Sequence, residues 1–111
     1  MSGGRTEPEG RYAALAEELS TAAGVTPSRM FGMPTLKAGG KAFAGLAQDG
    51  MVFRLGGEAH ARALSLPGAH LFDPAGMNRP MKAWVVVPAE HAEAWDDLAR
   101  EALSYLKQDR G

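Results

Sequence analysis

The sequence predicts an α+β fold in which a single antiparallel sheet carries helices packed on one face. Near both ends of the chain, apolar residues recur at three- and four-residue spacing, which is typical of helices with one buried side. Between these segments, short apolar runs are separated by glycine-rich turns, which indicates hairpins. With 111 residues, the chain has the length of one domain. We therefore expect a single domain, residues 1–111, with the element order α-β-β-β-α-β-β-α.

The first helix is predicted to begin at Thr6, because the sequence TEPE supplies an N-cap threonine, an early proline and then a glutamate. Residues 1–5 before it are expected to be a frayed tail. Gly24 is expected to end the helix in the left-handed conformation. The buried side of this helix is predicted to contain Tyr12, Leu15, Ala16, Leu19 and Ala23.

A three-stranded meander is predicted to follow, with strands at residues 30–37, 41–48 and 51–55. Gly39 and Gly40 favour a tight turn, because both can adopt positive φ, and Asp49 with Gly50 is the predicted second turn. Pro34 lacks an N–H and is expected to protect the first strand, as a sheet edge, from pairing with another chain. The glycines match neither GxGxxG nor GxxxxGK[ST], so they are interpreted as turn residues and not as a phosphate cradle.

The second half of the chain is predicted to contain a short helix at residues 58–65, a short strand at 69–72, a loop at 73–80 and a central strand at 81–87. Pro67 and Gly68 end the short helix, and the last helix follows Pro88. Trp95 is expected to anchor the last helix in the core, whereas Trp84 can face either side of the sheet. The buried side of the last helix is predicted to contain Ala92, Trp95, Leu98, Ala99, Ala102, Leu103 and Leu106.

The composition excludes several classes of site. The chain contains no cysteine, which excludes disulfide bonds, thiolate catalysis and cysteine-ligated zinc. It contains neither the run of about 20 apolar residues of a membrane helix nor the apolar run of a signal peptide, so we expect a cytoplasmic protein without a membrane partner. Residues 29–82 carry a net charge of +4 and the two ends carry −5, so a mildly basic sheet and acidic helices are expected.

Four stretches of the sequence together resemble the TfoX/Sxy N-terminal-domain-like family: Arg29–Gly32, Gly40–Ala44, Asp49–Leu55, and Val87–Pro88 with the tryptophan-bearing helix at Trp95. The resemblance spans about residues 9–107 and implies an α+β fold with helices on one antiparallel sheet. It implies no catalytic residues. Longer members of the family carry a second, helical domain and regulate natural competence in bacteria, and this chain is expected to hold only the first domain. At Met33–Leu36 the chain departs from the glycine- and tyrosine-rich strand of many relatives, and the similarly organised YjbR/MmcQ-like proteins are the alternative assignment.

The side chains that could support catalysis or bind a metal are scattered along the sequence. His60, His70 and His91 form neither an HxxxH nor an HExxH pattern. No serine lies in a GxSxG motif. Neighbouring carboxylates in the two long helices point about 100° apart and are interpreted as solvated helix faces. We therefore expect no catalytic residues, no cofactor and no metal.

An interaction surface is predicted around the meander and the loop before the central strand. Methionines can form adaptable binding surfaces, and the polar residues beside them can contact a partner or an anion. The predicted surface residues are Met33, Met77, Asn78, Arg79, Met81 and Lys82. We therefore expect a non-enzymatic protein-interaction domain with a regulatory role and an unknown protein partner. A weak homodimer is expected to use Met33, Met77 and Met81.

The alternative function is a weak nucleic-acid-binding module that uses the mildly basic face of the sheet. In that case Phe31, Phe43 or Phe53 would stack on bases. The basic residues are scattered, however, the net charge is −1, and the phenylalanines alternate as core residues do. A nucleic-acid partner is therefore the less favoured prediction.

Overall fold

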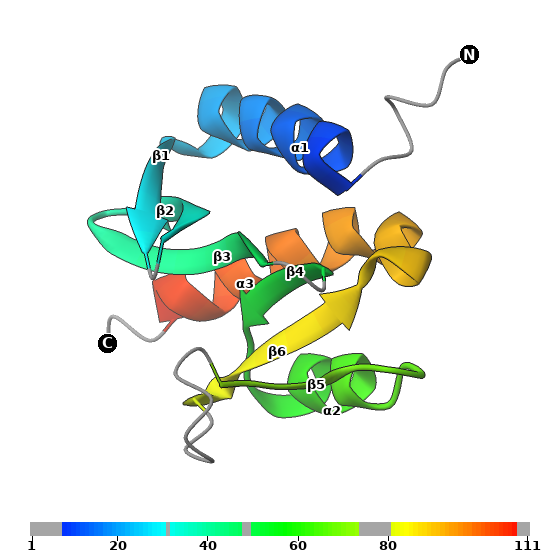
Figure 1. The fold of residues 1–111 in the computed structure, drawn as a ribbon. Coiled ribbons are helices and arrows are strands. Elements are labelled where there is room, and N and C mark those ends of the chain that lie inside the picture. The colour runs from blue at the N-terminus through cyan, green and yellow to red at the C-terminus, as the bar shows by residue number, and fades with distance from the viewer. Residues whose placement is uncertain (1–7, 31, 48–49, 74–80, 109–111) are drawn as a thin grey trace.

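In the computed structural model, the described residues are 8–30, 32–47, 50–73 and 81–108. Within them, six strands form one antiparallel sheet in the order β1-β2-β3-β4-β6-β5, and three α-helices pack against it (Figure 1). The elements, with a 3-10 helix named η2, are α1 (Pro8–Ala23), β1 (Val25–Met30), β2 (Met33–Ala38), β3 (Lys41–Ala47), β4 (Gly50–Arg54), α2 (Gly57–Leu64), β5 (His70–Phe72), β6 (Met81–Pro88), η2 (Ala89–Ala94) and α3 (Trp95–Gln108). None of the helices in these ranges has both the length and the apolar character that a membrane span requires.

The predicted fold class is confirmed, but the sheet contains one strand more than the sequence predicted. The additional strand is β1, which pairs with β2 from Met30 opposite Met33, so a hairpin replaces the single strand predicted there. The element order is therefore α-β-β-β-β-α-β-β-α. The sequence conceals β1 because Val25 is its one buried residue and because Pro27 is unusual in a strand. Proline is tolerated in β1 because this strand is the edge of the sheet.

The prediction that Pro34 protects a sheet edge is wrong. Pro34 lies in β2, which is flanked by β1 and β3. The pairing of β2 with β3 begins at Thr35 opposite Gly45, one residue beyond Pro34, which has no N–H to donate. The sheet edge next to β2 is β1, where Pro27 interrupts the row of donors, and β5 is the strand at the other edge.

Glycines serve two different purposes in the sheet. Gly39 and Gly40 have φ angles of 61° and 83°, which confirms the predicted tight turn between β2 and β3. The sequence predicts a turn at Gly50, whereas the structure pairs this residue with Pro88 as the first residue of β4. A Cβ at Gly50 would collide with the carbonyl oxygen of Val87 and lie 2.8 Å from the Cα of Pro88. Glycine is therefore required where β4 approaches β6.

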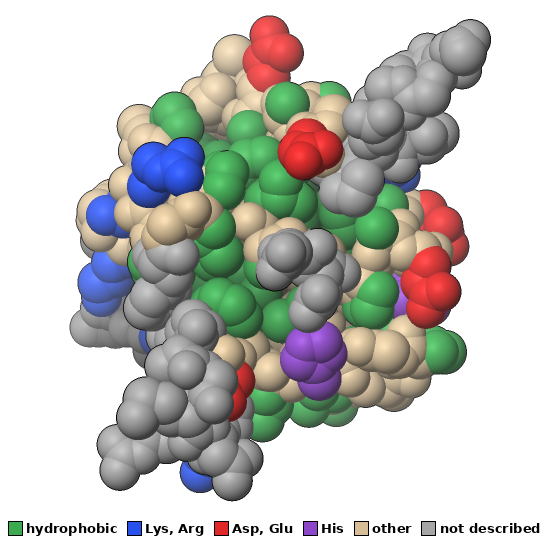
Figure 2. Space-filling model, viewed as in Figure 1, with side chains coloured by type: hydrophobic (Ala, Val, Ile, Leu, Met, Phe, Trp, Pro, Cys, Tyr) green, Lys and Arg blue, Asp and Glu red, His purple; other side chains and the backbone are tan. Residues whose placement is uncertain are grey.

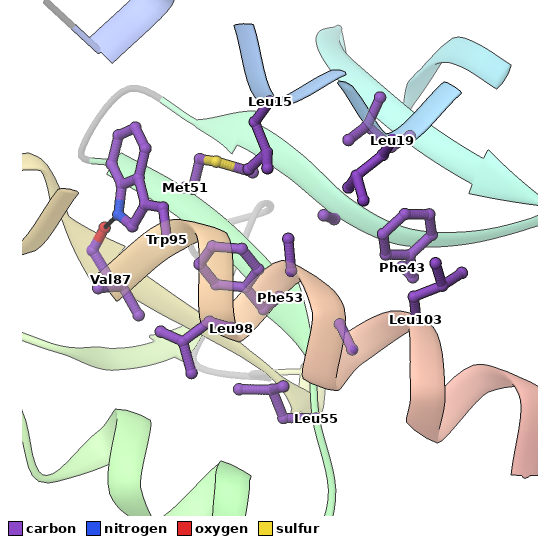
Figure 3. Packing of buried hydrophobic residues seen from close by; sticks show 14 of the residues in the cluster. Leu15, Leu19, Phe43, Met51, Phe53, Leu55, Val87, Trp95, Leu98 and Leu103 are labelled. Atoms are coloured by element: carbon purple, nitrogen blue, oxygen red, sulfur yellow. Dashed lines mark hydrogen bonds between the residues drawn. The ribbon is translucent and has the colours of Figure 1, made fainter. Parts of the chain in front are cut away.

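The three helices cover one face of the sheet, and the main core lies between them and the strands (Figure 1). Trp95 is 0% exposed, and its indole N–H donates to the carbonyl oxygen of Val87 at 3.2 Å, which confirms it as a core anchor. Figure 3 shows side chains of α1 and α3 meeting those of the central strands. The labelled core residues are Leu15, Leu19, Phe43, Met51, Phe53, Leu55, Val87, Trp95, Leu98 and Leu103.

The opposite face of the sheet, which no described helix covers, carries a second apolar cluster; we call it the helix-free face. Trp84 belongs to this cluster, whereas its neighbour Val85 faces the helices, so strand alternation places Trp84 on the helix-free face. The members of the cluster are Met33, Val52, Phe72, Trp84 and Val86. Because successive residues of β4 and β6 are buried on opposite faces, residues 51–53 and 84–87 form continuous apolar runs.

Candidate interaction surface

The structure describes the predicted interaction residues only in part. Met33 is 8% exposed, and its Cε lies 3.0 Å from the place that a Cβ on Gly45 would occupy. Lys82 is exposed. The side chains outside the described residues are those of Met77, Asn78, Arg79 and Met81. A homodimer through the methionines stays a prediction, and Met33 offers little free surface to it.

Each histidine side chain forms a hydrogen bond to a backbone carbonyl oxygen. The three hydrogen bonds run from Nε2 of His60 to Lys82 (2.7 Å), from Nδ1 of His70 to Gly68 (3.1 Å) and from Nε2 of His91 to Pro67 (2.9 Å). A carbonyl oxygen only accepts, so each of these ring nitrogens carries the donated proton. Within the described ranges, no three His, Cys, Asp or Glu side chains are grouped in a way that could hold a metal ion. The histidines therefore act as local structural contacts.

Basic side chains gather on the side of the molecule formed by β1, β2 and β3. The sequences of these three strands contain no acidic residue. Figure 2 shows Lys and Arg side chains on this side, and Asp and Glu side chains around α1 and η2. The basic residues of the three strands are Arg29, Lys37 and Lys41. Phe43 and Phe53 are 0% exposed and cannot stack on bases, so this part of the nucleic-acid interpretation is wrong; Phe31 lies outside the described residues.

An apolar hollow of about 300 Å³ lies between the end of α2 and the start of α3. Ala63 and Leu98, which are 0% and 5% exposed, are the most deeply buried of its apolar lining residues. Figure 3 shows Leu98 pointing from α3 toward α2. The other lining residues are Arg62, Ser65, Leu66, Ala94 and Asp97. The helical layer is therefore open at this point.

Ser65 shapes the hollow at the end of α2. Its backbone N–H donates to the carbonyl oxygens of Ala61 and Arg62 at 3.1 and 3.2 Å, and its hydroxyl donates to that of Arg62 at 2.7 Å. The N–H of Leu66 then donates to the carbonyl oxygen of Ala63 at 3.2 Å. These bonds turn the chain sharply, which brings Leu66 beside Ala63 in the lining.

A second hollow, of about 380 Å³ and more polar, adjoins the first. Arg62 and Asp97 line both hollows, so the two form one continuous surface, which we call the α2–α3 groove. The remaining lining residues of the second hollow are Arg100, Glu101 and Ser104. The groove is therefore apolar at one end and charged at the other.

Two exposed ion pairs lie along the groove. The guanidinium of Arg62 lies 3.7 Å from the carboxylate of Glu101, which joins α2 to α3. The guanidinium of Arg100 lies 2.6 Å from the carboxylate of Glu18, which joins α3 to α1. Asp97 has no ion pair within the part of the chain that the structure describes. The two arginines are thus engaged, whereas Asp97 lines the groove and has no cationic side chain paired with it among the described residues.

The model of the TfoX N-terminal domain family matches residues 17–106. The chain belongs to this family. The resemblance found in the sequence is thereby confirmed, and the matched region of this TfoX N-terminal domain includes every residue that lines the α2–α3 groove. No curated protein and no solved structure gives a match.

Sequence reasoning did not find the groove of this TfoX N-terminal domain. Its lining comes from two separate segments, residues 62–66 and 94–104. The sequence of each segment by itself predicts only a helix with a solvated polar side. The available signal was the small size of Ala63 and Ala94 among larger apolar residues. Alanine leaves space where leucine would fill it.

Proposed function

We propose that this TfoX N-terminal domain is a non-enzymatic protein-interaction domain that binds its partner in the α2–α3 groove and serves a regulatory role. The observation that carries the proposal is the apolar hollow of about 300 Å³ beside exposed charged groups. Apolar hollows with a polar rim are the usual anchoring points of protein interfaces. The cytoplasm is the compartment in which we expect the partner, on the basis of the cysteine-free composition.

The chemistry of the groove supports binding over catalysis. The hydroxyl that lines its polar end is that of Ser104, and no histidine is among the lining residues. A serine nucleophile needs an adjacent base to activate it. Arg62 and Arg100 are engaged with carboxylates. These groups are suited to positioning a partner and not to moving a proton or an acyl group.

The proposal is tested by filling the apolar hollow. Ala94 lines it and is partly buried, so Ala94→Leu places additional apolar volume where a partner side chain would enter. Ala13→Leu makes the same change at an exposed position of α1 and is the matched control. Each chain is immobilised and exposed to an extract of the source cells, after thermal melting has shown that both variants fold.

We expect a partner protein that is retained by the parent and by Ala13→Leu, and whose retention by Ala94→Leu falls by about tenfold. Retention of every bound protein by all three chains to the same extent would contradict the use of this groove. Substrate turnover by the parent that depends on Ser104 would contradict the non-enzymatic part of the proposal.

A second candidate function, weak nucleic-acid binding, is favoured by one observation: Arg29, Lys37 and Lys41 occupy adjacent strands that carry no acidic residue. Phosphate-driven binding weakens steeply with salt. A gel-shift titration with single-stranded DNA at low and moderate salt, repeated with the double variant Lys37→Glu, Lys41→Glu, tests it. Binding at low salt that the double variant loses would support this candidate, and no binding at low salt would remove it.

A further inference from the structure

The α2–α3 groove has the dimensions of a site for a chain segment. Its apolar end, about 300 Å³, is at the lower limit of the ~300–1,000 Å³ typical of small-molecule pockets. From Ala94 to Ser104 the lining extends roughly 15 Å along the helical layer, at about 1.5 Å per helical residue. A peptide segment presents side chains at intervals over such a length, whereas a compact ligand occupies one hollow.

The apolar end of the groove suits one aliphatic side chain. Its floor is formed by Ala63 and Leu98, and partly buried Leu66 and Ala94 lie at its sides. Burying an aliphatic side chain of a partner in such a hollow is favourable, because it removes apolar surface from water, and part of this gain offsets the costs of association. The apolar end can therefore anchor a partner side chain, but its affinity differs little between one aliphatic residue and another.

The charged part of the groove favours a basic partner group. Binding an acidic group would require it to compete with Glu18 for Arg100 or with Glu101 for Arg62. A basic group can approach Asp97, which lines both hollows, without breaking either ion pair. Complementary charges of this kind fix the register of a partner and exclude wrong partners.

We propose that the α2–α3 groove binds a peptide segment of a partner protein that inserts an aliphatic side chain between α2 and α3 and places a lysine or arginine beside Asp97. This inference rests on the proposed function and adds the chemistry of the partner. The aliphatic side chain occupies the hollow over Ala63 and Leu98, and the basic side chain marks where the apolar end meets the charged end.

The probe is a random peptide library displayed on phage and selected on the full chain. The selected peptides are expected to contain an aliphatic residue with a lysine or arginine close by. The affinity of a synthetic selected peptide is then measured by fluorescence anisotropy with the parent, with Asp97→Lys and with Asp96→Lys. Asp96 is the matched control, because it lies in the same first turn of α3 but does not line the groove.

Asp97→Lys should weaken binding by about tenfold or more, and Asp96→Lys by about twofold at most. A peptide whose basic residue is replaced by glutamate should regain affinity for Asp97→Lys. The inference is overturned if the selected peptides lack a basic residue, if the two lysine variants weaken binding equally, or if selection gives no peptide whose binding depends on the groove.

The Ala94→Leu variant separates failure of this inference from failure of the proposed function. If binding is lost in Ala94→Leu but is indifferent to the charge at Asp97, the groove binds protein segments of another chemistry and the proposed function stands. If selected peptides bind Ala94→Leu as tightly as the parent, both are overturned. Self-association of the parent that Ala94→Leu abolishes, measured by sedimentation, would make a second copy of the chain the occupant and would overturn the inference.

Discussion

The two faces of the sheet both carry buried apolar side chains, but only one of them is covered by the described helices. On the helix-covered face, β3, β4 and β6 meet large side chains of α1 and α3, and Trp95 fills the space beside Val87 (Figure 3). On the helix-free face, all five members of the buried cluster come from strands. The difference shows that an apolar strand does not by itself reveal which face carries the main core. That information lies in the helices.

The largest effect is expected from truncating the two tryptophans, one on each face. Trp95→Ala should destabilise the protein by about 3–5 kcal/mol, because the residue is 0% exposed and its N–H is hydrogen-bonded. Trp84→Ala should cost about 2–3 kcal/mol, since no described helix packs over it. Urea unfolding of both variants measures the difference. Equal costs would show that the two faces contribute equally to stability.

The next effect concerns the contact between β4 and β6, which both faces share. Gly50→Ala should cost about 2–3 kcal/mol, because its Cβ would collide with the backbone of Val87. Gly39→Ala is the matched control, since its φ is also positive but a Cβ there would meet nothing within 4 Å. It should cost about 1 kcal/mol. Similar unfolding midpoints for the two variants would show that β4 and β6 can move apart at Gly50 without a loss of stability.

A smaller effect reports on burial at the margin of the helix-covered face. Tyr12 of α1 is 8% exposed, and burial raises its pKa from 10.0 to about 12. The folded state therefore favours the neutral phenol, so the contribution of Tyr12 is complete below pH 10 and is lost as the pH rises towards 12. Near pH 11 the parent should lose about 1 kcal/mol relative to Tyr12→Phe, compared with near pH 8. Urea unfolding at both pH values measures this, and parallel losses would contradict a buried phenol.

The smallest effect is expected outside both faces, at the ion pair between Glu18 and Arg100. Their atoms lie 2.6 Å apart, but the side chains are 53% and 51% exposed. A double-mutant cycle with Glu18→Ala and Arg100→Ala should give a coupling of about 0.2–0.5 kcal/mol, since water screens the pair. A coupling above about 1 kcal/mol would show that this pair holds α1 and α3 together more firmly than an exposed contact does.

The elements that the sequence predicts well are those whose local chemistry agrees with their tertiary role. The helix α3 is long and periodic, and Trp95 therefore falls in the core as expected. Gly39 and Gly40 need positive φ, which few other residues allow. The strand β1 was concealed because its one buried residue gives no alternation, and Pro27 argues against a strand unless the strand is known to be an edge.

Other features could not be predicted, because they depend on which segments meet. Every residue from Trp84 to Val87 is apolar and buried. The sequence of this run therefore shows no alternation that could predict which face of the sheet carries Trp84. The α2–α3 groove depends on the turn at Ser65, which sets Leu66 beside Ala63 and opposite Leu98. No local pattern in the sequence predicts that these three side chains lie close together. The predicted surface at Met77, Asn78 and Arg79 lies outside the described residues, so it stays a prediction.

The strand order also determines when a binding surface can exist during synthesis. The strands β1 to β4 are neighbours in sequence and in space, so these hairpins can form from local contacts as the chain emerges. The strand β6 must return to β4 after α2 and β5, and α3 follows it. The lining of the groove ends at Ser104, only a few residues before the end of α3. A partner that recognises the groove therefore recognises only chains whose synthesis has passed Ser104, and it does not bind shorter nascent chains.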